Sequence, residues 1–112
     1  MSTTEHMSFH EATVIDFCQK DEVIQLELQD VLVNKAKCDV VLELSAVTNI
    51  TIDGKASDTV SMETSDGEIL SLELGKDTFS VIIEWHDFNN GRAFTKSYVI
   101  AGGRVVISVS RC

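Results

Sequence analysis

Residues 79–85 read Phe-Ser-Val-Ile-Ile-Glu-Trp, and this stretch decides the fold. Large apolar side chains fall at every second position, and the positions between them carry a serine, an isoleucine and a glutamate. Successive side chains of an extended strand point to opposite faces. The period of two therefore predicts a β-strand with one buried face and one face toward water.

The same period recurs along most of the chain. The stretches that show it are 12–18, 23–30, 38–44, 47–52, 59–63, 70–74, 79–85, 94–100 and 104–110. Short strands at regular spacing favour an all-β fold. We expect about eight antiparallel strands in a curled sheet, a sandwich or a barrel, with at most one short helix. Residues 31–37 are the place for that helix, although valine and Asn34 favour a strand followed by a turn there.

Turn-forming dipeptides separate the apolar stretches. Asp53-Gly54, Asp66-Gly67 and Asn90-Gly91 readily adopt the positive φ of tight hairpins, and Gly102-Gly103 joins the last two stretches. Proline is absent and no change of composition marks a linker. These features predict one domain over residues 1–112, with residues 1–8 flexible.

The cysteines and the apolar runs bear on the compartment. Cys18, Cys38 and Cys112 are odd in number and lack a Cys-x-x-Cys spacing, which favours reduced thiols, the first two of them buried as small apolar side chains. No apolar run approaches the ~20 residues of a membrane-spanning helix, and the first residues do not resemble a secretory signal. We expect a cytoplasmic protein.

The net charge of −9 is unevenly distributed. Residues 1–78 carry 16 acids and 5 bases, whereas residues 79–112 carry 2 acids and 4 bases, including all three arginines. An acidic surface repels a phosphate backbone and an anionic membrane, so we expect neither nucleic acid nor membrane as partner. It keeps a small protein in solution, and it also suits a basic protein partner.

Motifs of catalysis are missing from the sequence. There is no Gly-x-Ser-x-Gly elbow, no glycine-rich phosphate loop before a helix and no calcium-binding loop pattern. A zinc site would need the fold to bring His10 and His86 together, because residues four apart in a strand, such as His6 and His10, lie about 13 Å apart. We therefore expect no catalytic residue, no metal and no cofactor.

A group of candidate binding residues surrounds the Asn90-Gly91 turn. Residues 85–92 combine the only tryptophan with a histidine, a phenylalanine and an arginine, and tryptophan and arginine are enriched in binding hot spots. Trp85 also continues the apolar face of its strand, which would leave His86, Asp87 and Phe88 as the exposed part. All four are candidate partner-binding residues.

Residues 8–15 read Ser-Phe-His-Glu-Ala-Thr-Val-Ile and precede an alternating strand. This opening resembles that of small bacterial domains whose first strand is introduced by Phe-His-Asp-Ala or close variants, with Glu11 where aspartate is usual. Some of these domains are immunity proteins of polymorphic toxin systems. The resemblance implies a non-catalytic neutraliser that blocks a toxin, and it adds His10 and Glu11 to the candidate binding residues.

Three functional hypotheses follow. The first is a non-catalytic protein-binding domain, whose partner would be a basic protein such as a toxin. The second is a structural module that forms a homodimer through an edge strand, for which residues 104–110 are the candidate. The third is a small metal-dependent enzyme using His10, Glu11, His86 and Asp87.

Overall fold

The alternating stretches form strands in the computed structural model, which describes residues 7–102 and 104–112. The strands are β1 (Met7–Ser8), β2 (Thr13–Lys20), β3 (Val23–Val33), β4 (Ala36–Ser45), β5 (Asn49–Ile52), β6 (Lys55–Ser57), β7 (Gly67–Leu74), β8 (Thr78–Asp87), β9 (Arg92–Ala101) and β10 (Arg104–Arg111). The described residues include no helix, and hence none that is able to cross a membrane.

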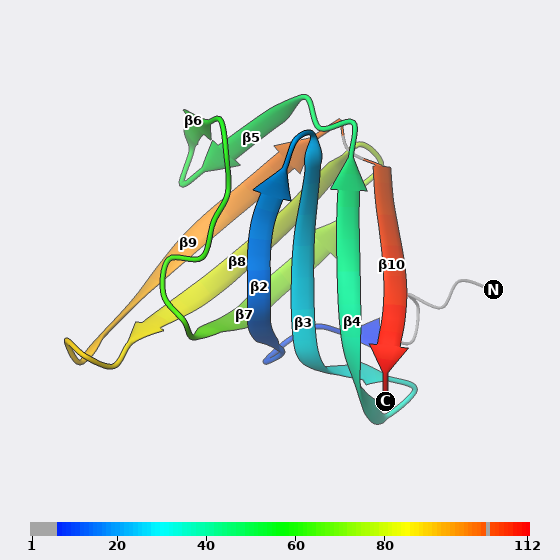
Figure 1. Ribbon diagram of the computed structural model, residues 1–112, viewed down its shortest axis with the longest axis vertical. Coiled ribbons are helices and arrows are strands. Elements are labelled where there is room, and N and C mark those ends of the chain that lie inside the picture. Colours follow the sequence, from blue (N-terminus) through cyan, green and yellow to red (C-terminus); the bar gives the residue numbers. More distant parts are fainter. Residues whose placement is uncertain (1–6, 103) are drawn as a thin grey trace.

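All ten strands belong to one antiparallel sheet (Figure 1). Its order is β10-β4-β3-β2-β7-β8-β9-β5-β6, and β1 pairs with the end of β3. The sheet is not closed, because β10 and β6 lie at its two ends. The expectation of an all-β fold is confirmed, and of the arrangements considered it is the curled sheet that forms.

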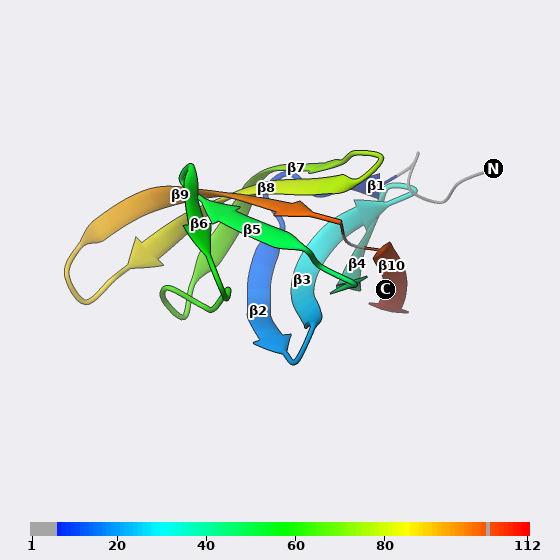
Figure 2. The same ribbon diagram turned by 90° about the horizontal axis from the view of Figure 1, so that it is seen from above.

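The sheet curls where β2 meets β7. These strands share only two register positions, Thr13 with Glu68 and Val14 with Gly67. Beyond this corner, β7 and β8 run diagonally behind β2, β3 and β4 (Figure 1), and Figure 2 shows one half bent over the other. The apolar faces of both halves therefore meet, as in two packed sheets.

The buried core comes from the inward positions of both halves. Its residues are Ala12, Val14, Phe17, Ile24, Leu26, Leu28, Val31, Cys38, Val40, Leu42, Leu44, Ile50, Val60, Ile69, Phe79, Val81, Ile83, Trp85, Tyr98 and Ile100. The alternation in β3, β4 and β8 predicts their inward faces correctly. Burying each large apolar side chain contributes about 1.5–3 kcal/mol, so this core is the main favourable contribution to folding.

Two-residue turns with positive φ at both residues form at two of the connections. Asp53 and Gly54 join β5 to β6 with φ of 52° and 81°, the left-handed conformation that suits a two-residue hairpin. Asn34 and Lys35 likewise have positive φ and join β3 to β4. The strand-and-turn interpretation of residues 31–37 is confirmed, and no helix forms there.

Two local predictions are wrong. Residues 59–63 are not a strand, because the side chains of Ser57 and Thr64 hydrogen-bond to nearby backbone groups in place of a ladder. Asp66-Gly67 is not a hairpin turn, because Gly67 is the first residue of β7 and pairs with both β2 and β8.

A bulge in β7 reverses its alternation. The register with β8 shifts between Ile69 and Ser71, so the inward positions before and after the bulge are Ile69 and Leu72. Ile69 is buried, and Leu72 is partly buried and packs against the core. Leu74 remains 39% exposed. The sequence predicts one apolar face of Leu70, Leu72 and Leu74, and the extra residue of the bulge breaks that face.

The two ends of the chain also differ from expectation. Residues 7–8 form β1 against β3, whereas the remainder of the 1–8 segment expected to be flexible lies outside the described residues. Gly102 follows β9 with φ 78°, and its neighbour Gly103 lies outside the described residues. After this connection the chain does not form a hairpin, since β10 pairs with β4.

Trp85 is fully buried at the corner of the sheet. A Cβ atom at Gly67 would lie 2.7 Å from Trp85 Cζ3, so only glycine lets the indole lie against the β7 backbone. Trp85 Nε1–H donates to the Tyr98 hydroxyl over 3.0 Å, and Tyr98 meets Phe17 edge to face at 5.1 Å. Trp85 is therefore a core residue, and its inclusion among the partner-binding residues is wrong.

We expect Tyr98→Phe to lower the free energy of unfolding by about 1–3 kcal/mol at neutral pH, because the Trp85 N–H loses its buried acceptor. Burial raises the pKa of Tyr98 from 10.0 to about 12. The unfolded chain loses this proton first, so wild-type stability declines as the pH rises from about 10 to about 12. Urea denaturation at neutral and alkaline pH measures both effects, and tyrosinate absorbance follows Tyr98 directly, since it is the only tyrosine. An unchanged alkaline slope in the variant contradicts this assignment.

Candidate binding surface at the end of the β8–β9 hairpin

The β8–β9 hairpin presents most of the candidate binding residues. Its ladder runs from Thr78 opposite Ala101 to Asp87 opposite Arg92. Asp87 then holds the loop, because its two carboxylate oxygens accept from the Asn90 backbone N–H at 3.3 Å and from the Asn90 side-chain amide at 2.7 Å. The loop is thus fixed by local hydrogen bonds, as is usual for aspartate in turns.

Phe88 is the most exposed large apolar residue of the described chain, at 75%. Its ring stacks on the imidazole of His86, with centroids 5.8 Å apart and planes 9° from parallel. His86 is only partly exposed and is itself held by a 3.3 Å contact from Nε2 to Glu84 Oε1. The aromatic pair is therefore ordered before any partner arrives.

Two shallow clefts flank this aromatic pair. The larger is lined by Glu63, Thr64, Ser65, His86, Asp87, Phe88 and Asn89. The other is lined by Asp87, Arg92, Ala93 and Phe94. Asp87 belongs to both clefts, whereas Phe94, 38% exposed, lies opposite Trp85 in the ladder and therefore on the other face of the hairpin from His86. We call Asp87, Phe88 and the ring of His86 the hairpin surface.

His10 and Glu11 lie elsewhere, against β7. The His10 Nδ1–H donates to the Leu70 carbonyl over 2.9 Å, and the Glu11 N–H donates to the Ile69 carbonyl over 2.8 Å. Their side chains are about two-thirds and three-quarters exposed. They meet β7 at its bulge, where they fix the entry to β2, and they are not part of the hairpin surface.

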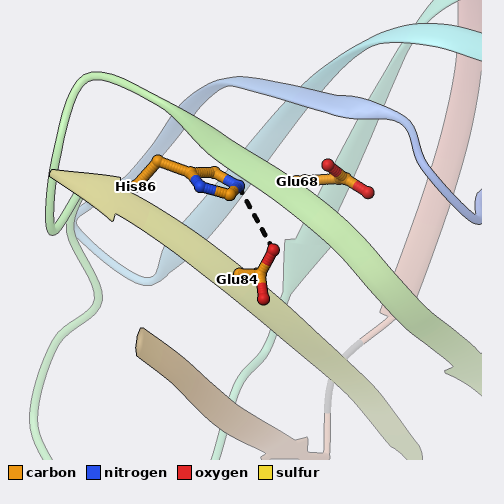
Figure 3. Close-up of side chains that lie close together, drawn as sticks. All are labelled: Glu68, Glu84 and His86. Carbon is orange, nitrogen blue, oxygen red and sulfur yellow. Dashed lines mark ion pairs between the residues drawn. The ribbon is translucent and has the colours of Figure 1, made fainter. Parts of the chain in front are cut away.

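A second group of polar residues lies on the outer face of β7 and β8 (Figure 3). Glu68 pairs directly with Glu84 across the ladder, and His86 follows Glu84 on the same face. One ligand atom from each of the three lies within 4.8 Å of the others. Glu68 and Glu84 are absent from the sequence-based candidates, because only the β7–β8 register brings them to His86.

A third acidic region lies where the β2–β3 turn approaches β6. This cleft is lined by Gln19, Asp21, Glu22, Val47, Thr48, Asn49, Ile50, Ala56, Ser57 and Asp58. It carries three acids and no base, and no aromatic side chain lines it. It is more acidic than the clefts at the hairpin surface, where Arg92 and the Glu63–Lys96 ion pair reduce the negative charge, and it lacks the exposed rings.

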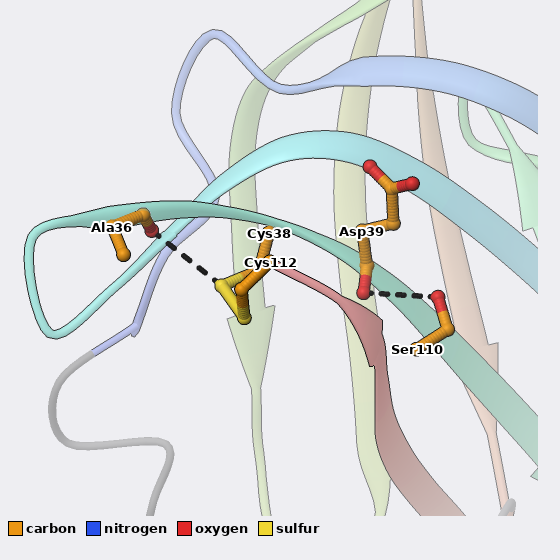
Figure 4. Close-up of a disulfide and its surroundings, with 5 residues drawn as sticks. All are labelled: Ala36, Cys38, Asp39, Ser110 and Cys112. Carbon is orange, nitrogen blue, oxygen red and sulfur yellow. Dashed lines mark hydrogen bonds between the residues drawn. A yellow bond between two sulfur atoms is a disulfide. The ribbon is translucent and has the colours of Figure 1, made fainter.

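The cysteines correct an expectation. Cys38 on β4 and Cys112 after β10 are joined by a disulfide (Figure 4), whereas the sequence predicts reduced thiols. Spacing along the chain does not reveal a pair 74 residues apart that the β4–β10 ladder brings together. Disulfides persist mainly in oxidising compartments, so these two cysteines do not support a cytoplasmic location.

Cys18 is the one free cysteine among the described residues. Burial raises the pKa of its thiol, and the hydrogen bond from Sγ to Asp16 Oδ2 at 3.5 Å raises it further. A thiol held in its protonated form is a poor nucleophile. Cys18 therefore does not supply a reactive thiolate at neutral pH.

Comparison of the chain with protein-family models, with curated proteins and with solved structures yields no match.

The disulfide makes a testable contribution to stability. We expect Cys112→Ser to lower the free energy of unfolding by about 2–4 kcal/mol, because the bridge limits the freedom of a long loop in the unfolded chain. Cys18→Ser is the matched control and retains the wild-type value more closely. Denaturation with and without a reductant measures the effect. Equal stability of the wild type in both conditions contradicts the prediction.

Proposed function

We propose that this chain is a non-catalytic protein-binding domain whose hairpin surface docks a protein partner. The exposed ring of Phe88, stacked on His86 between two clefts, is the observation that carries the proposal. Binding energy at protein interfaces concentrates in a few aromatic or arginine anchors at well-packed centres. Phe88 is such an anchor.

Order in the free protein favours this role. The stack on His86 and the Asp87 bonds to Asn90 fix the hairpin end in the unbound state. A partner then loses less binding free energy to the ordering of side chains and loop. The hairpin surface is thereby better suited to docking than the acidic cleft between the β2–β3 turn and β6, which has no comparable anchor.

Charge indicates the kind of partner. The chain carries a net charge of −9, and 16 of its 18 acids lie in residues 1–78. The hairpin surface itself is less acidic, because Glu63 is paired with Lys96 at 3.2 Å and Arg92 lies opposite Asp87. The field of the whole chain is therefore what favours a basic partner. Opposite potentials raise the association rate and suppress wrong partners. We therefore propose a basic partner with an apolar pocket for Phe88.

An immunity role is the most concrete form of this proposal. The resemblance of residues 8–15 to the opening of bacterial immunity domains supports it, since many toxins that attack nucleic acids have basic clefts. The domain would then neutralise a toxin by covering such a cleft. Co-expression with the products of neighbouring genes, followed by isolation of a complex and assay of protection from toxicity, tests this role. The absence of both a complex and protection would reject the immunity role.

Self-association through β10 is the second candidate. β10 lies at the end of the strand order, and its Val106 and Val109 are 49% and 44% exposed. The free edge of a terminal strand is a template for pairing with another chain. Sedimentation over a wide concentration range tests this candidate, and a monomer at the highest concentration counts against it.

The anchor role of Phe88 has a direct test. We expect Phe88→Ala to weaken partner binding by about 2 kcal/mol or more, about thirtyfold in Kd, because the hot-spot ring is lost. Its thermal stability should stay near that of the wild type, since the ring is largely exposed. Leu32→Ala on β3 removes a side chain of 40% exposure away from the hairpin and is the matched control. Titration calorimetry measures both variants, and equal losses would contradict the assignment.

Salt dependence tests the charge argument. We expect the association rate constant to fall about tenfold between low salt and about 0.5 M salt, because screening removes long-range steering. The dissociation rate should change much less. Surface-based kinetics at several ionic strengths separates the two rates. An association rate independent of salt would remove charge complementarity from the proposal.

A further inference from the structure

We infer that Glu68, Glu84 and His86 form a binding site for a divalent transition-metal ion, with Zn²⁺ the best fit. This inference goes beyond the protein-binding proposal and does not depend on a partner. The three residues come from the adjacent strands β7 and β8, and Figure 3 shows His86 facing Glu84, with Glu68 beside them on the neighbouring strand.

The spacing of the ligand atoms suits tetrahedral zinc. Zn–N and Zn–O bonds of about 2.0–2.2 Å place neighbouring ligand atoms about 3.3 Å apart. His86 Nε2 and Glu84 Oε1 are 3.3 Å apart in the protein. One ligand atom of Glu68 lies within 4.8 Å of both, so the Glu68 side chain must rotate toward them to supply the third ligand.

The electrostatics of the ladder favour a cation at this point. Glu68 and Glu84 are direct cross-strand partners, and like charges in this position destabilise a sheet. Their ladder neighbours on the other sides are Thr13 and Thr95, which carry no charge. Within the described ranges, the one ion pair made by either glutamate is that of Glu84 with His86. A bound metal ion would relieve the repulsion between both carboxylates.

Partial burial and ring orientation add to the case. The side chains of His86 and Glu84 are 26% and 35% exposed, so they are less hydrated than ordinary surface groups. The stack with Phe88 holds the imidazole plane while Nε2 points to the glutamates. Outer contacts that orient a ligating histidine raise metal affinity.

The donor set selects the ion. One imidazole nitrogen and two carboxylates suit zinc and its neighbours, whereas calcium needs six to eight oxygen ligands. Three protein ligands leave a fourth position for water or for a side chain of another molecule. The sequence suggests His10 as a ligand together with His86. In the structure, His10 is hydrogen-bonded to the Leu70 carbonyl and is not in the site.

The test uses the full chain without a histidine tag, stripped with a chelator and titrated with Zn²⁺ by calorimetry. We expect about one ion per chain with a Kd on the order of micromolar, and a rise of the melting temperature on binding. Bound Co²⁺ should give the visible absorption bands of a tetrahedral ion. Failure to bind Zn²⁺ at about a hundred times that concentration would overturn the inference and leave the protein-binding proposal untouched.

Variants locate the ion. Glu68→Gln and His86→Ala should each weaken Zn²⁺ binding at least tenfold, while the controls Glu73→Gln on the same strand and His10→Ala bind as the wild type. Metal-free Glu68→Gln should melt no lower than the metal-free wild type, because it removes the like-charge pair, and this outcome guards against misfolding as an explanation. Unchanged binding in both site variants, or loss in His10→Ala, would overturn the assignment.

Discussion

The contact of Trp85 with the backbone of Gly67 is the constraint on which the rest of the structure depends. Gly67 pairs with Val14 of β2 on one side and with Trp85 of β8 on the other, so it lies where the sheet turns. The absence of a side chain at Gly67 lets the indole fill the corner, and Tyr98 satisfies its buried N–H. A larger residue would push the two halves of the sheet apart, because interiors are too densely packed to absorb the volume.

The packing of Trp85 also determines which side chains of β8 face outward. Because Trp85 points to the core, its neighbours Glu84 and His86 must point outward on β8. The same register sets Glu68 beside Glu84, and the strand then ends one residue before Phe88. The proposed docking ring and the proposed metal ligands are therefore neighbours, and His86 belongs to both. An ion at Glu68 and Glu84 would fix the ring on which Phe88 stacks.

The sequence predicts the local structure better than the connections between distant parts. Alternation identifies the inward faces of β3, β4 and β8, and it indicates Phe88 as exposed. Alternation does not predict the strand order, because a period of two shows which side chains face inward but not which strands pair with each other. For that reason the Cys38–Cys112 bridge and the place of Glu68 beside His86 come only from the ladder. The bulge at Ile69 escapes prediction because one extra residue leaves no mark in composition.

The position of β10 has a consequence for the order of folding. The hairpins β2–β3 and β3–β4 join residues close in sequence and can form early, whereas β10 must reach back to β4, with Arg104 opposite Ser45. Pairings of high sequence separation are slow, since loop-closure entropy is lost before contacts repay it. During synthesis β4 is thus an open edge until the last strand has emerged, and in that interval the nascent chain is most exposed to wrong pairing with a neighbour.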